Sequence, residues 1–280
     1  MTQCRFHVLK AGLCYHPAAM ARQGASLCPT EFPALAGLIV HPSEGAILFD
    51  TGYDPAFFTA TAPMPERLYR WATPVTLREG EAAADQLRRF GLGPNDVRAV
   101  VISHFHGDHI AGLHAFPNAR LFCAKDGAAE LTRHGRFGRV RRGLLATLAP
   151  PAWRDRAHFF EDLPRCALSA DLQPFETGAD LFGDGSLLAV PLPGHCAGHW
   201  GLVIIDENGR RTFLVGDAAW SSGAIRDNAP PPRLTTALLG HTQTYRRTLL
   251  DLHQLHTRNN DILIAPSHCP EISALAEKAP

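Results

Sequence analysis

The sequence has no long apolar run and no closely spaced cysteine pair. No stretch of about 18 apolar residues occurs, so we expect no membrane-spanning helix and no membrane partner. Residues 1–7 have no apolar segment of the kind that directs secretion. The seven cysteines include no Cys-x-x-Cys pair, which is typical of reduced thiols in a cytoplasmic protein. The alternative is a secreted protein whose leader has been removed.

Neither sign of charge is in excess, since 27 lysines and arginines balance 27 acidic residues. Proteins that bind nucleic acid usually carry a basic surface, so we expect no nucleic-acid partner. One local exception is the run Arg133, Arg136, Arg139, Arg141 and Arg142. We interpret it as a solvated face, with a rim that attracts anions as the alternative.

The sequence also lacks a Ser/Gly-rich or charge-only linker. Its 280 residues are 45% hydrophobic, which is ample for one large core, and the metal-capable motifs described below extend from residue 104 to residue 268. We therefore predict a single domain over residues 1–280. Residues 126–180 are less regular and rich in proline, and we predict a helical lid or insertion within them.

Apolar and β-branched runs predict several strands. Two pairs are separated by turn residues and predict hairpins, at 34–40 with 46–50 and at 202–206 with 211–215. Single strands are expected at 97–102, 120–124, 187–192 and 261–265. Amphipathic periodicity predicts helices at 81–90 and 241–258.

The central motif contains four metal-capable side chains within six residues: His104, His106, Asp108 and His109. Neutral imidazole is a good ligand for zinc and similar ions, and a carboxylate offsets the charge of the cation. The motif directly follows the predicted strand 97–102. A pattern this dense is a stronger signal than most short motifs.

Three further candidate ligands also follow apolar runs: His195, Asp217 and His268. Residues placed at strand ends can converge on one edge of a sheet, where rigid strands hold ligand geometry. We therefore expect these side chains to join the central motif in one site.

Four short segments together resemble the metallo-β-lactamase superfamily. They are 103–109, 193–195, 216–217 and 267–268, and the turn at 48–52 also matches an early Asp-containing turn of that family. The resemblance extends from about residue 35 to residue 268. It implies an α/β fold, an αββα sandwich of the metallo-β-lactamase type, with metal ions at its edge.

The resemblance also implies a ligand set. One metal ion would be bound by His104, His106 and His195. The second would be bound by Asp108, His109 and His268, with Asp217 bridging the two. Two zinc ions are expected, with iron or manganese as alternatives.

Two neighbouring residues are interpreted as supports of these ligands. Asp50 would orient a ligand through a hydrogen bond, although an aspartate in a plain turn is the alternative. His199 follows His195 by four residues and is interpreted as a supporting or packing residue, because the ligand set already satisfies two metal ions.

The expected reaction is hydrolysis by a hydroxide that bridges the two ions. Asp108 would carry a proton to the leaving group. Dedicated β-lactamases of this superfamily lack the bridging carboxylate, so Asp217 argues against that activity. Few residues of this sequence follow His268, so we do not expect the helical C-terminal domain of glyoxalase II-type thioesterases.

The resemblance is closest to acyl-homoserine lactonase-like members, which implies a small-molecule lactone or related ester as substrate. Thioesterase, phosphoester or aryl-ester hydrolase, and iron-dependent sulfur dioxygenase are the alternative enzymes, and a catalytically silent binding protein is the non-enzymatic one. Residues 14–33 and the segment after residue 126 are expected to line an acyl pocket. The oligomeric state stays open, with a dimer among the options.

One departure from the lactonase pattern concerns the third residue after Asp217. Those enzymes often have a tyrosine there, whereas this chain has Trp220, and an indole cannot act as a phenolic acid. His241 and Tyr245 are the candidates to replace the phenol. Trp220 itself would form a wall for an apolar substrate, or be an ordinary core tryptophan.

Overall fold

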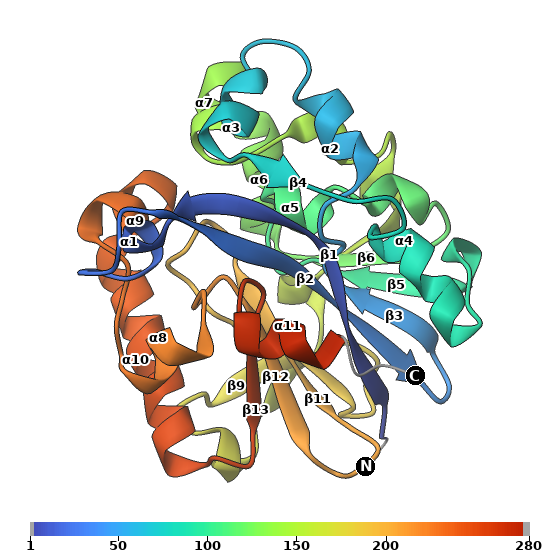
Figure 1. Ribbon diagram of the computed structural model, residues 1–280. Coiled ribbons are helices and arrows are strands. Elements are labelled where there is room, and N and C mark those ends of the chain that lie inside the picture. The colour runs from blue at the N-terminus through green and yellow to red at the C-terminus, as the bar shows by residue number, and fades with distance from the viewer. Residues whose placement is uncertain (1–2, 277–280) are drawn as a thin grey trace.

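Two β-sheets lie face to face in the computed structural model, which describes residues 3–276 (Figure 1). In spatial order, the seven-stranded sheet consists of β4 (Val75–Thr76), β1 (Arg5–Pro17), β2 (Pro29–His41), β3 (Gly45–Phe49), β5 (Val97–Val101), β6 (Arg120–Cys123) and β7 (Ala157–Phe159). The six-stranded sheet consists of β13 (Leu263–Pro266), β12 (Arg211–Gly216), β11 (Trp200–Ile205), β10 (Leu187–Pro191), β9 (Thr177–Asp180) and β8 (Arg165–Ala167).

Helices cover the outer faces of both sheets (Figure 1). The seven-stranded sheet is covered by α2 (Pro55–Ala60), α3 (Arg67–Ala72), α4 (Ala83–Gln86), α5 (Gly107–Ile110), α6 (Lys125–Arg133) and α7 (Arg136–Arg141). The six-stranded sheet is covered by α8 (Ser222–Arg226), α9 (Arg233–Leu239) and α10 (Thr242–Arg258). The short α1 (Ala18–Ala21) joins β1 to β2, and α11 (Pro270–Ala276) packs on β1. None of the helices within residues 3–276 is long and apolar enough to cross a bilayer.

Apolar side chains on both faces of the strands form three apolar layers, one between the sheets and one under the helices on each side. Leu38 contributes to the layer between the seven-stranded sheet and its helices. The next residue, Ile39, contributes with Leu202 to the layer between the two sheets. Val203 then faces the layer between the six-stranded sheet and α10. Successive strand residues point to opposite faces, so this pattern produces the αββα sandwich and confirms the expected fold class.

Most elements with a strong sequence pattern occur where they were predicted. The first predicted hairpin is β2–β3, with Gly37 opposite Phe49. The second is β11–β12, and the long C-terminal helix is α10. The sequence analysis did not predict β1, because a register shift between Lys10 and Leu13 breaks its alternation.

The segment 126–180 is α-helical only in its first part, and short 3-10 turns follow. Helices α6 and α7 occupy that first part. Strand β7 then forms the edge of the seven-stranded sheet, and β8 and β9 are the last two strands at one side of the six-stranded sheet. The α-helical portion of the predicted insertion thus consists of α6 and α7. Movement of these helices as a lid stays a prediction.

Candidate metal centre

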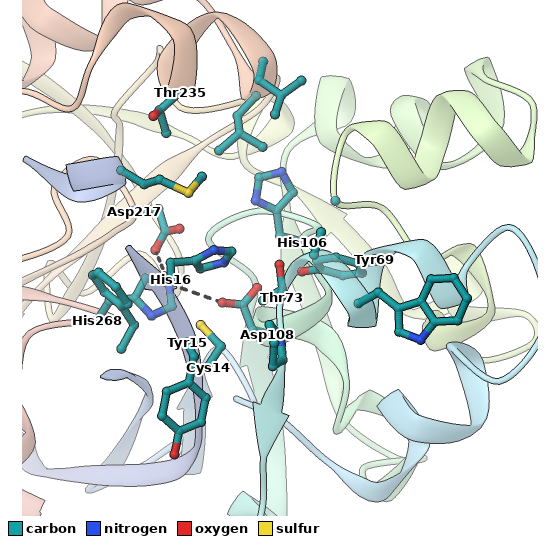
Figure 2. A pocket seen from close by; sticks show the side chains of 18 of the residues that line it. Cys14, Tyr15, His16, Tyr69, Thr73, His106, Asp108, Asp217, Thr235 and His268 are labelled. Carbon is teal, nitrogen blue, oxygen red and sulfur yellow. Dashed lines mark ion pairs between the residues drawn. The ribbon is translucent and has the colours of Figure 1, made fainter. Parts of the chain in front are cut away.

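Strand ends bring the seven candidate ligands together at one edge of the sandwich. The central motif begins just after β5 and continues into α5. Asp217 directly follows β12 and His268 follows β13, which run parallel to each other. Figure 2 shows His106, Asp108, Asp217 and His268 around one space, with dashed ion pairs that join His268 to both aspartates.

Three histidines form a first group of donor atoms. His104 Nε2 and His195 Nε2 each lie 3.0 Å from His106 Nδ1. Asp217 Oδ2 completes the group, 3.2 Å from His195 Nε2 and 4.0 Å from His104 Nε2. Ligands about 2 Å from a tetrahedral zinc ion lie about 3.3 Å from each other. The spacing therefore fits a metal ion held by three imidazoles and a carboxylate.

A second group shares the other oxygen of the same carboxylate. His268 Nε2 lies 3.2 Å from Asp217 Oδ1 and 3.2 Å from Asp108 Oδ2. His109 Nε2 lies 3.4 Å from Asp217 Oδ1 and 3.5 Å from Asp108 Oδ2. Each oxygen of Asp217 thus faces a different group, which is the arrangement of a bridging ligand.

Unsatisfied polar atoms show that the donor set fits metal ions. His109 Nε2 and Asp217 Oδ1 are buried and have no hydrogen-bond partner within the described part of the chain. His104 and His195 both direct a ring nitrogen at His106 Nδ1, which offers either one lone pair or one proton and can therefore pair well with only one of them. Buried polar groups are seldom left unpaired, and a cation between the donors would satisfy all of them.

Burial and charge act differently on the two groups. Burial holds the pKa of His104 and of His195 well below the ordinary value and lowers the pKa of His106 to about 4. These imidazoles are neutral and offer lone pairs. Burial would lower the pKa of His109 and His268 as well, but nearby carboxylates, Asp108 and Asp217 among them, raise it well above the ordinary value. The second group therefore lies in a negative field that attracts a cation.

Hydrogen bonds on the far side of the imidazoles orient them. The Asp50 carboxylate accepts from the Ser103 amide at 2.8 Å, from the Ser103 hydroxyl at 2.7 Å and lies 2.7 Å from His109 Nδ1. His268 Nδ1 lies 2.8 Å from the Pro33 carbonyl oxygen, which accepts its proton and leaves Nε2 free. Asp50 is thus placed as the expected support of a ligand.

His199 also contacts the centre from behind. Its Nε2 accepts a hydrogen bond of 3.0 Å from the amide of Asp217. This contact agrees with the interpretation of His199 as a supporting residue. Cys196 lies close to the first group as well, because its sulfur is within 4.8 Å of the donor atoms of His104, His106 and His195.

Sequence comparison decides the family. The model of the metallo-β-lactamase superfamily matches residues 29–268. The chain belongs to the metallo-β-lactamase superfamily. It is a metal-dependent hydrolase of that family, which confirms the resemblance and the class of enzyme expected from the sequence.

Individual relatives cover most or all of the chain. The N-acyl homoserine lactonase AttM of Agrobacterium fabrum is 27% identical, over 100% of this chain and 98% of its own. A "probable metallo-hydrolase" of Mycobacterium tuberculosis is 29% identical, over 85% of this chain and 76% of its own.

Solved structures share the fold. An N-acyl homoserine lactone hydrolase with the product N-hexanoyl-L-homoserine at its catalytic metal centre has a TM-score of 0.74 and 18% identity, covering 98% of this chain and 96% of that one. The dizinc lactonase AidC has a TM-score of 0.63 and 15% identity, covering 96% of this chain and 89% of that one.

In this member of the metallo-β-lactamase superfamily, a cavity of about 960 Å³ opens onto the metal centre. Its wall includes His106, Asp108 and Asp217 from the centre. Most of the remaining wall is apolar and comes from β1, α1, β2, α3, α7 and α9. Residues 14–32 and 137–143 both contribute, so the two segments expected to line a pocket do line this one.

Trp220 forms part of the cavity wall, in agreement with one of the two interpretations made from the sequence. Its ring centroid lies 6.3 Å from that of Phe32 and 6.2 Å from that of His195. Its Nε1 is buried, and no group within residues 3–276 accepts a hydrogen bond from it. The indole thus keeps an unused donor beside the metal centre.

His241 and Tyr245, which the sequence analysis offered as replacements for a phenol at the substrate site, are not among the described residues that line the cavity. This corrects the sequence analysis. His241 is exposed, and its ring accepts a hydrogen bond from the Thr244 amide at the start of α10. Tyr245 packs in the apolar layer beneath α10, where burial and the charge of Asp217 raise its pKa far above the ordinary value.

Tyr53 and Tyr69 line the cavity instead, and the sequence analysis missed both. Figure 2 shows the Tyr69 ring next to Thr73 and His106. A Cβ atom at Gly107 would lie 3.0 Å from Tyr69 Cε1, so this ring fills the space beside the central motif. Residue 69 lies in a short helix remote from every motif, and no sequence signal placed it here.

Proposed function

We propose that this chain is a lactonase with two metal ions, most simply zinc, that opens N-acyl homoserine lactones. The observation that carries the proposal is the large apolar cavity that ends at the metal centre. Such a cavity suits a substrate with a polar, hydrolysable ring and an apolar acyl chain. The match to a lactonase over the whole chain supports the same substrate class.

The proposed ligands are the three histidines of the first group and Asp108, His109 and His268 of the second, with Asp217 shared. Bound divalent ions supply Lewis acidity and lower the pKa of water. Neutral imidazoles and two carboxylates suit zinc, and iron or manganese remain the alternatives for the same donor set.

Asp108 is the residue proposed to move a proton. Its carboxylate faces both the second donor group and the cavity. Burial would raise the pKa of Asp108, but the charges of His109 and His268 lower it, so the group is ionised. In the proposed reaction it would accept the proton that the attacking water gives up and donate it to the ring oxygen that leaves the carbonyl carbon.

Trp220 is proposed to position the substrate. Trp220 lines the cavity and its buried Nε1 has no partner within the described residues, so this N–H is available to a substrate carbonyl. An indole has one donor and no acceptor, so it can orient an oxygen atom without taking part in proton transfer. This role replaces the one that the sequence analysis assigned to His241 and Tyr245.

The proposal extends to the organisation of the chain. Every proposed ligand belongs to one continuous sandwich, which supports a single domain with its helical insertion at α6 and α7. All seven cysteines are unpaired, which supports the expected cytoplasmic location.

Proton release on adding lactones to the zinc-loaded protein tests the function. The panel comprises homoserine lactones with short and long acyl chains, together with thioesters, aryl esters and phosphate esters. We expect rapid release from acyl homoserine lactones, abolished by a chelator and restored by zinc. Release from another ester class alone, with bound metal verified, would replace the lactonase assignment by that class. Oxygen uptake with a persulfide and no hydrolysis would identify a dioxygenase.

A further inference from the structure

The mouth of the cavity is apolar on its outer surface as well as inside. Trp71 of α3 is 63% exposed, Phe137 of α7 is 70% exposed and Leu234 of α9 is 83% exposed. Leu68 and Leu238, from α3 and α9, are also exposed. We call these five residues the apolar rim. Leu68, Trp71, Phe137 and Leu238 line the cavity, and Leu234 lies one helical turn before Leu238 on the same face of α9.

Three helices that carry the apolar rim also carry a concentration of positive charge. Helices α3, α7 and α9 together contain six arginines and no acidic residue: Arg67, Arg70, Arg136, Arg139, Arg141 and Arg233. The whole chain has as many acidic as basic residues, so this concentration is a local property. Figure 1 shows α3 and α7 together, with α9 beside α1 across from them.

Few acidic groups neutralise these arginines. Glu66 accepts hydrogen bonds from Arg136 and so offsets one of the six charges. Arg67 and Arg139 donate to backbone carbonyl oxygens, which carry no net charge. The helices around the mouth therefore combine exposed aromatic and aliphatic side chains with a net positive charge, and Arg141 itself lines the cavity.

We propose that this face docks onto the surface of an anionic lipid bilayer, with the apolar rim inserted among the head groups and the arginines on lipid phosphates, which would reverse the expectation of no membrane partner. Exposed tryptophan, phenylalanine and leucine beside arginine is the composition of interfacial membrane contacts. The cavity would then open toward the bilayer. An apolar substrate that partitions into lipid reaches the metal centre without crossing water.

A second copy of the chain could also cover this face, but the positive charge of the face argues against such a dimer. A two-fold contact would place this surface against its own copy. Six arginines on each side would then face each other with little acid to neutralise them, which is destabilising. The same charges are attracted by anionic lipid.

Vesicle flotation tests the proposal with the full, metal-loaded chain. The probes are neutral phosphatidylcholine vesicles and vesicles that also contain phosphatidylglycerol. We expect binding to the anionic vesicles, weakening as salt rises, and little binding to the neutral ones. Absence of binding to anionic vesicles at low salt would overturn the proposal.

Paired variants assign the binding to this face. The apolar variant combines Phe137→Ser with Leu234→Ser, and the charge variant combines Arg67→Gln with Arg233→Gln. Each arginine removed should weaken vesicle binding roughly fivefold. The matched controls are Leu275→Ser on α11 and Arg258→Gln at the far end of α10, which should bind like the unchanged chain. Equal binding by rim variants and controls would refute the assignment.

Metal content and melting temperature should be unchanged in every variant, which excludes misfolding as the cause of lost binding. Sedimentation equilibrium measures whether the chain forms a dimer instead. A dimer that dissociates in the Phe137→Ser, Leu234→Ser variant would assign the face to a second copy and overturn lipid docking. None of these results depends on the identity of the hydrolysed substrate, so they test lipid docking independently of the lactonase proposal.

Discussion

At the scale of single residues, Asp217 has the most demanding position. One oxygen of its carboxylate faces His195 and the other faces His109 and His268. Burial would raise the pKa of Asp217, but the charges of His268, His109 and His195 hold it well below the ordinary value. The group is therefore a permanent anion between two donor groups.

The change Asp217→Asn should remove the carboxylate shared by the two donor groups while keeping a side chain of the same shape. An amide has one acceptor oxygen, and its NH₂ group would point at a cation. We expect bound metal to fall from about two ions per chain to about one or fewer, and hydrolysis to be lost. Elemental analysis after dialysis measures the ions, and full occupancy with full activity would contradict the bridging role.

Asp50 acts on the metal centre through His109 and Ser103. In Asp50→Ala the imidazole of His109 loses its anchor, and we expect metal affinity to fall about 10- to 100-fold. The control is Asp54→Ala, which removes the cap of α2. That change should cost about 1 kcal/mol of stability and leave metal affinity unaltered. Competition with a chelator compares the affinities, and equal values in both variants would reject the supporting role.

Trp220 provides a donor that the protein itself does not use. Trp220→Phe keeps an aromatic wall and removes this N–H. We expect kcat/KM for acyl homoserine lactones to fall about tenfold, the value of one hydrogen bond at the upper end of its usual range. Metal content serves as the control. An unchanged kcat/KM would reduce Trp220 to a wall of the cavity.

At the scale of elements, the loop before His195 packs tightly against the start of α10. Gly194 has φ +128°, and a Cβ atom there would lie 2.3 Å from the Tyr245 amide nitrogen. A side chain at this position would therefore displace either the loop with the ligand or the helix. The position requires glycine both for its backbone conformation and for its close approach.

Gly194→Ala should therefore unfold the chain or abolish metal binding. Gly183→Ala is the matched control, because Gly183 also has a positive φ, +79°, but open space around its Cα. That control should cost only about 1–2 kcal/mol, the strain of a left-handed residue. Thermal unfolding and metal content compare them. Similar stability losses in both variants would show that the contact with α10 is unimportant.

At the scale of the whole molecule, the metal centre joins the two sheets. His104, His106, Asp108 and His109 follow strand β5 of one sheet, and His195, Asp217 and His268 follow strands of the other. Ions held between these residues would tie the sheets together at the edge where the strands end.

Removal of the ions should consequently destabilise the entire fold. A ligand present at about 100 times its Kd adds about 2.7 kcal/mol to the stability of the state that binds it. For a chain of this size we expect the melting temperature to fall by roughly 5–10 °C on chelation, and to recover when zinc is restored. An unchanged melting temperature would show that the ions do not link the sheets.

The arrangement of motifs explains how much of the fold and the site could be predicted. His104 to His109 form one turn after a strand, so their proximity follows from spacing alone. The hairpin β11–β12 and helix α10 carry strong local patterns. Strand β1 and helix α3 do not, because a register shift interrupts one and the other is only six residues long.

The sequence alone determined the α/β class, the metal-capable residues and the family, because these depend on local periodicity and short motifs. Only the tertiary structure decided that Tyr69 rather than Tyr245 faces the cavity. It also decided that the arginine-bearing helices α3, α7 and α9 meet around one opening. Both facts depend on how residues far apart in the chain are brought together, and no local pattern encodes the direction in which a short helix presents its side chains.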